Sequence, residues 1–189
     1  MIAQAGSQPY GGSEVTGVSA AAAIRIRDAV PEDWPAMWPF MREIVAAGET
    51  FSWDTQTSEE DARAGWFRHG QSGFTVVATD ASGAVLGTAE CGPNHGGPGA
   101  HIASASFMVD ARHSGRGVGR ALGEYVLDRA RAEGFRGMQF NAVAQSNVPA
   151  VRLWRSLGME IVATIPEGFH HPADGYVGLH VMYRRLAPA

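Results

Sequence analysis

The segment that most constrains the fold is a short run in which three glycines alternate with larger residues. It comprises Gly115, Arg116, Gly117, Val118, Gly119 and Arg120, and it separates an apolar run from a stretch with helical apolar spacing. Glycine permits a tight turn there and lets a ligand approach the main chain closely. The first N–H groups of a helix lack intrahelical partners and lie at the positive end of its dipole. The segment therefore predicts a strand–turn–helix junction with an anion site suited to a pyrophosphate.

Two common phosphate-binding motifs do not fit this glycine segment. The dinucleotide fingerprint G-x-G-x-x-G fails in both registers, because Arg120 or Leu122 stands at the last glycine position. All 15 basic residues of the chain are arginine, which excludes the lysine-dependent P-loop and Schiff-base chemistry. A tight turn that binds no ligand is the structural alternative.

The remaining periodicities predict one α/β domain over residues 23–189, after a flexible N-terminal tail over residues 1–22. Helices are predicted over residues 31–48, 58–67, 118–133 and 148–157, with a kink at Pro39 in the first. Strands are predicted over residues 25–30, 74–79, 85–91, 101–109, 138–143, 161–165 and 176–186, with a loop over 166–175. The order βααβββαβαββ indicates a mixed sheet flanked by helices.

Two segments resemble motifs of the GNAT N-acetyltransferases. Residues 107–122 are similar to the acetyl-CoA motif (Q/R)-x-x-G-x-(G/A) of that family, with Ser114 at the Gln/Arg position. Residues 147–159 resemble the family segment N-x-x-A-x-x-L-Y-x-x-x-G-F, with Trp154 at the tyrosine position. The two motifs and the element order cover nearly the whole domain. The resemblance implies a mostly antiparallel α/β fold whose central strands splay apart.

The same resemblance implies an acetyl-CoA site built largely from main chain, with acetyl-CoA as cosubstrate. The pantetheine arm would lie in the gap between the splayed strands, and the pyrophosphate would lie on the glycine segment. The residues implied to hold the cosubstrate are Phe107, Met108, Val109, Gly115, Arg116, Gly117, Val118, Gly119, Arg120 and Asn147. Direct transfer is implied, in which a neutral amine attacks the thioester and a backbone N–H stabilises the oxyanion.

Two side chains are the candidates for catalysis. Glu90 is the best candidate for a general base because it lies in an apolar strand next to the cosubstrate strand, with His101 and His180 as alternatives. Asn141 lies in the middle of a strand, where an amide needs a partner. We expect Asn141 either to orient substrate and polarise the thioester carbonyl, or to make a buried structural hydrogen bond.

The proton donor to the leaving thiolate is not marked by the sequence. The indole of Trp154 can donate a hydrogen bond but cannot act as an acid near neutral pH. Core packing is the alternative interpretation of Trp154. Tyr176, Tyr183 and Ser156 are unranked alternatives for the proton donor.

The acceptor is expected to be a primary or secondary amine of a small molecule, an amino acid or its analogue. Residues 86–88, 92–97 and 101–105 resemble a GNAT subgroup that includes fungal acetyltransferases acting on the proline analogue azetidine-2-carboxylate, with Ser104 where an asparagine of that subgroup is expected. The loops with Phe51, Trp53 and His170 would form the acceptor pocket, or else a subunit contact. A non-catalytic acyl-CoA-binding sensor module and a protein N-acetyltransferase are the alternative functions.

Composition limits the other partners and the compartment. A formal net charge of −4 provides no basic face for nucleic acid, and no apolar run approaches a membrane span. A lone cysteine, Cys91, suits a reducing cytoplasm, and no histidine or cysteine spacing predicts a metal site. A homodimer is expected only because members of the family often dimerise.

Overall fold

The computed structural model describes residues 24–67 and 73–186, so the predicted N-terminal tail lies outside the described residues. A seven-stranded sheet has the strand order β1-β2-β3-β4-β5-β7-β6. The strands are β1 (Arg25–Asp28), β2 (Phe74–Thr79), β3 (Val85–Pro93), β4 (Ile102–Val109), β5 (Gly137–Ala144), β6 (Glu160–His171) and β7 (Gly175–Arg185). The helices in the described residues are α1 (Trp34–Ala47), α2 (Glu59–Trp66), α3 (Val118–Ala132) and α4 (Val148–Ser156). The predicted element order is confirmed.

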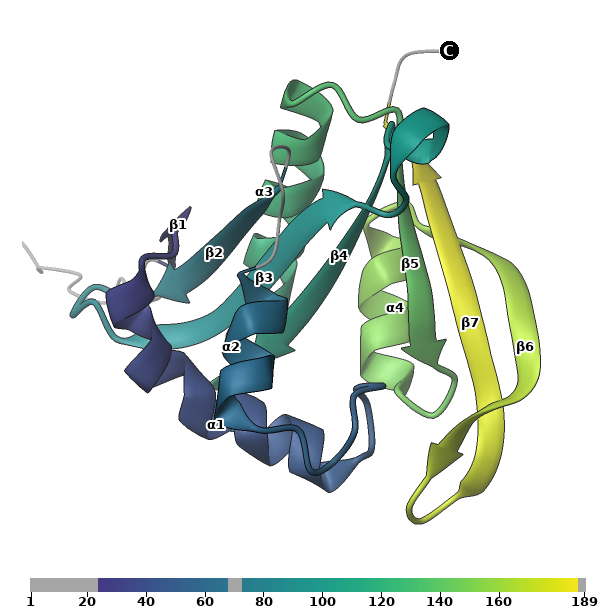
Figure 1. Ribbon diagram of the computed structural model, residues 1–189, viewed down its shortest axis with the longest axis horizontal. Helices are drawn as coiled ribbons and strands as arrows, with labels where there is room; N and C mark the ends of the chain where they lie inside the picture. The colour runs from purple at the N-terminus through teal and green to yellow at the C-terminus, as the bar shows by residue number, and fades with distance from the viewer. Residues whose placement is uncertain (1–23, 68–72, 187–189) are drawn as a thin grey trace, which may run out of the picture.

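The sheet is antiparallel except at its centre, where β4 and β5 run parallel. Those two strands pair only at Ile102 with Gly137 and at Ala103 with Met138, and beyond these residues they diverge (Figure 1). The predicted splaying of the central strands is therefore confirmed. Helices α1 and α2 cover one face of the sheet, and α3 and α4 cover the other (Figure 1).

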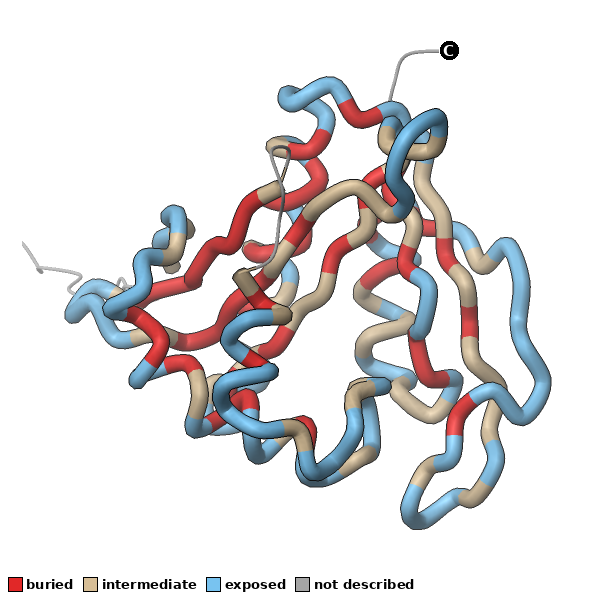
Figure 2. The backbone as a smooth tube through the Cα atoms, viewed as in Figure 1, coloured by how far each residue is buried: buried red, intermediate tan, exposed pale blue. Residues whose placement is uncertain are grey.

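Each face of the sheet has its own apolar core. Val76 and Ala78 of β2 pack with the residues of α3, whereas Val77 between them packs with α1 and α2. This alternation follows the two-residue period of a strand, and it explains why β2 is buried along its length (Figure 2). A fully buried side chain such as Leu122 on α3 contributes about 1.5–3 kcal/mol to this packing.

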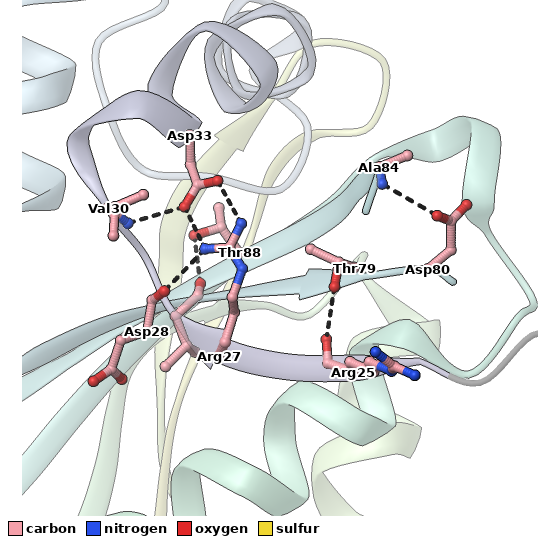
Figure 3. A network of polar contacts seen from close by, with 10 residues as sticks. Arg25, Arg27, Asp28, Val30, Asp33, Thr79, Asp80, Ala84 and Thr88 are labelled. Carbon is pink, nitrogen blue, oxygen red and sulfur yellow. Dashed lines mark hydrogen bonds and ion pairs between the residues drawn. The ribbon is translucent and has the colours of Figure 1, made fainter. Parts of the chain in front are cut away.

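An ion pair fixes the connection between β1 and α1. The guanidinium of Arg27 donates to both carboxylate oxygens of Asp33 at 2.7 Å, and the backbone N–H of Val30 donates to Asp33 Oδ2 at 2.9 Å (Figure 3). The hydrogen bonds from Arg27 hold the pKa of the Asp33 carboxyl below its usual range, although burial opposes the shift. The pair thus joins the edge strand of the sheet to the helix that covers its neighbours.

The prediction of a loop over residues 166–175 is wrong, because β6 continues to His171 and β7 begins at Gly175. Pro166, Glu167 and Gly168 suggest a loop in the sequence, but they lie in an irregularity of the ladder between Ile165 and Phe169. Glu167 has a positive φ of 54° there. An edge strand tolerates proline at such a bulge, since the missing N–H would face away from the sheet.

Candidate functional site

The glycine segment forms an open turn of main-chain donors at the start of α3. Gly115 and Gly117 have φ values of 76° and 84°, in the left-handed region that favours glycine, and Gly117 is the N-cap of α3. In the described structure, the backbone N–H groups of residues 115–120 donate to no backbone carbonyl. No heavy atom lies within 4 Å of a Cβ built on Gly115 or Gly117. The turn therefore fits an anionic group, which the helix dipole would also stabilise.

The arginines around this turn are held by the protein in different ways. Arg112 forms a bidentate ion pair with Asp110 at 2.6–2.9 Å, which lowers the pKa of that carboxyl. Arg116 lies 2.9 Å from the ring of His113, and Arg120 donates to Ser156 at 2.8 Å. The charge of Arg112 is therefore neutralised locally. Arg116 and Arg120 are predicted to lie beside the pyrophosphate. In the described structure neither has a bidentate carboxylate partner, although Arg120 pairs with Glu124 through one contact of 3.4 Å.

The gap between β4 and β5 is closed on one face by aromatic rings. Phe107 of β4, Phe140 of β5 and Trp154 of α4 pack with centroid distances of 4.7, 5.0 and 5.7 Å. Trp154 is only 7% exposed, so packing accounts for its position. The neighbours of Phe107 on β4 differ from it: Met108 is buried in the core with α1, and Val109 is partly buried near α3.

Asn147, predicted to meet the pantetheine arm, caps α4. Its Oδ1 accepts a hydrogen bond from the backbone N–H of Ala150 at 3.2 Å. A capping role accounts for asparagine at this position. Its contact with the cosubstrate remains a prediction.

Glu90 lies on the other face of the sheet, paired across the ladder with Ser106 of β4. Burial raises the pKa of Glu90, and a hydrogen bond with the Ser106 side chain partly opposes that shift. Glu90 borders two cavities. One, of about 380 Å³, is lined by Trp53, Asp54, Thr57, Asp61, Gly65, Trp66, Glu90 and Ser106. The other, of about 390 Å³, is lined by Glu90, Gly92, Pro93, Asn94, His95, Gly96 and Ser104.

The predicted acceptor residues separate into two places. Phe51 and Trp53 pack edge to face at 5.1 Å, and both rings contact Trp66 at 6.2 and 5.9 Å. Only Trp53 reaches the cavity beside Glu90. His170 lies on β6, where its ring packs at a tilt against Tyr176 with centroids 4.7 Å apart, and it lines neither of the two cavities.

Asn141 belongs to a cluster of side-chain amides that sequence reasoning missed. Gln139 Nε2 donates to Asn141 Oδ1 at 2.7 Å, and Asn141 Nδ2 donates to Asn94 Oδ1 at 2.6 Å. Asn141 is exposed, so these hydrogen bonds are not buried as the structural alternative expected, and its contact with substrate remains a prediction. The two-residue strand period could have indicated Gln139, whereas Asn94 lies in a Gly/Pro-rich segment that is typical of a turn.

The other candidate groups lie away from the two cavities. His101 Nδ1 contacts the Pro98 carbonyl at 3.0 Å, and the buried His180 contacts Thr164 Oγ1 at 2.8 Å. Ser156 Oγ donates to the Leu153 carbonyl. The other groups that the sequence left unranked, Tyr176 and Tyr183, line neither cavity.

The described residues offer little for nucleophilic or metal chemistry. Cys91 is buried, which raises the pKa of its thiol and disfavours the thiolate. No group of three His, Cys, Asp or Glu side chains in the described ranges could hold a metal ion. Within the same ranges, every helix is too short or too polar to cross a membrane.

Comparison with known proteins places this geometry among the acetyltransferases. The model of the acetyltransferase (GNAT) family matches residues 38–159. The L-methionine sulfoximine/L-methionine sulfone acetyltransferase of Pseudomonas aeruginosa is 33% identical over 147 residues, which cover 75% of this chain and 83% of that protein. N-acetyltransferase aca1 of Schizosaccharomyces pombe is 29% identical over 109 residues, which cover 57% of this chain and 52% of that protein.

Two solved structures share the fold. A GCN5-related N-acetyltransferase from Kribbella flavida is 55% identical, with a TM-score of 0.84 over 86% of this chain and 98% of that chain. A phosphinothricin acetyltransferase from Sinorhizobium meliloti, solved in complex with acetyl-CoA, is 25% identical. Its TM-score is 0.77 over 87% of this chain and 89% of that chain.

Proposed function

Because the chain belongs to the GNAT family of acetyltransferases, we propose that it is an acetyl-CoA-dependent N-acetyltransferase with a small-molecule acceptor. The acetyl group passes directly to a primary or secondary amine of an amino acid or an amino acid analogue. The observation that carries this proposal is the position of Glu90. Its carboxylate borders two cavities and pairs with Ser106 on β4, the strand that borders the splayed gap and leads to the glycine turn.

The donor side of the site fits an acyl-CoA. The open turn at Gly115 and Gly117 offers unpaired N–H groups to a pyrophosphate, and β4 beyond Ala103 offers an edge that β5 does not pair. When bound, acetyl-CoA supplies a thioester whose acetyl group is activated for transfer. The edge of β4 would hold the pantetheine arm through backbone hydrogen bonds, and Arg116 and Arg120 would add positive charge beside the phosphates.

The acceptor side of the site fits an amine. An amine is an effective nucleophile only as the free base, so an incoming ammonium must lose a proton in the site. Glu90 is placed to take that proton, and because burial raises its pKa, its carboxylate is a stronger base than an exposed one. Trp53 and Trp66 line the same cavity together with the carboxylates Asp54 and Asp61, so both apolar and anionic groups face an incoming ammonium.

The relatives favour an amino acid analogue as acceptor. Those from Pseudomonas aeruginosa and Escherichia coli are named as an L-methionine sulfoximine/L-methionine sulfone acetyltransferase and an L-amino acid N-acyltransferase. A partly buried carboxylate with a raised pKa beside this cavity favours an enzyme over a sensor module. The modest size of both cavities, about 380 and 390 Å³, favours a small molecule over a protein chain.

The test is a turnover screen in which release of the CoA thiol is followed colorimetrically. The panel contains L-methionine sulfoximine, L-methionine sulfone, phosphinothricin, L-proline and azetidine-2-carboxylate, with mass spectrometry of each acetylated product. Binding of acetyl-CoA to the wild type and to Glu90→Gln is measured in parallel by calorimetry. We expect turnover of at least one of these amines by the wild type, and loss of turnover with retained binding in the variant. Tight binding of acetyl-CoA with no acetylation of any amine would overturn the proposal.

A further inference from the structure

Three side-chain amides meet over β4 on the face of the sheet that carries Glu90. Gln139 and Asn141 lie two residues apart on β5 and therefore point to the same face. Asn94 follows β3, and its position is fixed because its backbone N–H donates to the Ile102 carbonyl at 2.8 Å. Asn94 and Ser104 both line the cavity that Glu90 borders. The amide cluster is thus part of the wall of the proposed acceptor site.

The hydrogen bonds of the Asn141 side chain determine which of its groups can still bind a ligand. Its Oδ1 accepts from Gln139 Nε2 at 2.7 Å and, in a long contact, from Asn94 Nδ2 at 3.4 Å. Its Nδ2 donates one N–H to Asn94 Oδ1 at 2.6 Å. The second N–H points toward Ser104 Oγ at 3.5 Å, which is the limit of a hydrogen bond. Asn141 can therefore offer a ligand its second N–H, and its oxygen, already held by Gln139, can accept a further hydrogen bond only in place of the long contact with Asn94.

We propose that Asn94 and Gln139 are positioning residues that hold Asn141 with an N–H turned toward the bound substrates. Asn141 then binds an oxygen atom that accepts a hydrogen bond. This oxygen belongs either to the acetyl thioester or to the carboxyl group of an amino acid acceptor. The inference rests on the proposed function, because it assigns how that site recognises its substrates.

Substitutions at Gln139 test whether the Asn141 amide presents its N–H or its oxygen to the substrates. In Gln139→Glu, a carboxylate replaces the donor and faces Asn141 Oδ1, so the Asn141 amide must turn over and present its oxygen to the substrates. Gln139→Leu removes the donor without forcing that rotation. We expect kcat/KM to fall by about 30-fold or more in Gln139→Glu and by about 3-fold in Gln139→Leu. Gln139 is only partly buried, so melting temperatures should stay close to that of the wild type. Equal losses in the two variants would overturn the proposal.

A double-mutant cycle separates positioning through Asn141 from a general effect of charge or packing. In an Asn141→Leu background, Gln139→Glu and Asn94→Leu should cause no further loss of kcat/KM, because the group that they position is gone. Losses that persist in that background would refute the assignment. L-Proline and pyrrolidine, which lacks the carboxyl group, distinguish the two sources of the oxygen. An Asn141→Leu penalty confined to proline assigns the acceptor carboxyl, and an equal penalty with both assigns the thioester.

A measurement without turnover keeps this inference separate from the proposed function. In ¹H–¹⁵N spectra of the protein alone, Asn94→Leu and Gln139→Leu should shift the Asn141 side-chain amide signals and speed their exchange with solvent. Unchanged Asn141 signals in both variants would overturn the inference, even if the enzyme acetylates amines. Absence of turnover by the wild type would count against the proposed function, whereas the spectra would still test the amide cluster.

Discussion

Replacement of Gly117 by alanine tests whether the turn before α3 is a ligand cradle or only a turn. Gly117 has a φ of 84°, and a residue with a Cβ pays about 1–2 kcal/mol to adopt this conformation. No heavy atom lies within 4 Å of the added Cβ, so no packing cost is added. For a domain of this size, the strain corresponds to a fall in melting temperature of roughly 2–8 °C.

The second effect of Gly117→Ala is on acetyl-CoA. The new methyl group occupies space beside main-chain donors, and each charge-assisted hydrogen bond lost costs about 1.5–3 kcal/mol. We therefore expect the Kd for acetyl-CoA to rise by roughly 10- to 100-fold, measured by isothermal titration calorimetry.

Gly83→Ala is the matched control for this experiment. Gly83 lies in the turn before β3 with a φ of 87°, and its added Cβ also meets no heavy atom within 4 Å. It should lose a similar amount of stability but keep the wild-type Kd. If the two variants bind acetyl-CoA equally well, the cradle does not hold the cosubstrate, and the assignment of the glycine segment is refuted.

Three further substitutions test the base, an ion pair and a helix contact. Glu90→Gln should lower kcat/KM by about 10²- to 10⁴-fold yet raise the melting temperature at pH 7. The reason for the higher melting temperature is that burial raises the pKa of Glu90, so its charged form destabilises the fold as the pH rises. If the kcat/KM of the wild type falls at acid pH with the pKa of an exposed glutamate, Glu90 is not the base. Asp33→Asn should cost about 1–3 kcal/mol of unfolding free energy in urea at neutral pH, by loss of the pair with Arg27. Because the folded-state pKa of Asp33 is lowered, this difference should shrink as the pH falls through the acid range, and a constant difference would argue against the pair. At a solvent-exposed position of a helix, a substitution such as Gly123→Ala would stabilise the helix by about 1 kcal/mol. Here the added Cβ would lie 2.7 Å from Leu157 Cδ1 and 3.0 Å from Trp154 Cζ3, so we expect a lower urea midpoint. A higher midpoint would show that these side chains move aside at little cost.

The order of helices and strands could be predicted because local patterns determine it. Glycines 115 and 117, the apolar stripe of α3 and the short apolar run of β2 each depend on neighbours within a few residues. The hairpin of β6 and β7 could not be predicted in the same way. Pro166 and Gly168 favour a loop locally, but the hydrogen bonds to β7 outweigh that preference.

In the candidate site too, the sequence identified individual residues but not which of them lie together. The sequence marked Glu90 and Asn141 as polar groups on strands, and Trp53 as an aromatic residue in a loop of the acceptor pocket or of a subunit contact. It did not show that Trp53 and Glu90 share a cavity, since 37 residues separate them along the chain. Nor did it show that Asn94 bonds to Asn141 across β4, because asparagine in a turn usually serves the turn itself.

The sequence by itself determined the main-chain part of this protein: a glycine turn before a helix, which needs only local backbone freedom to expose its N–H groups. It also determined the family resemblance, because both motifs are continuous in the chain. Only the tertiary structure decided the side-chain chemistry. The raised pKa of Glu90 arises from burial by segments distant in sequence, and the Asn141 amide is paired with Asn94, which follows β3 and lies 47 residues away in the chain. Both depend on packing between elements, which no local pattern encodes.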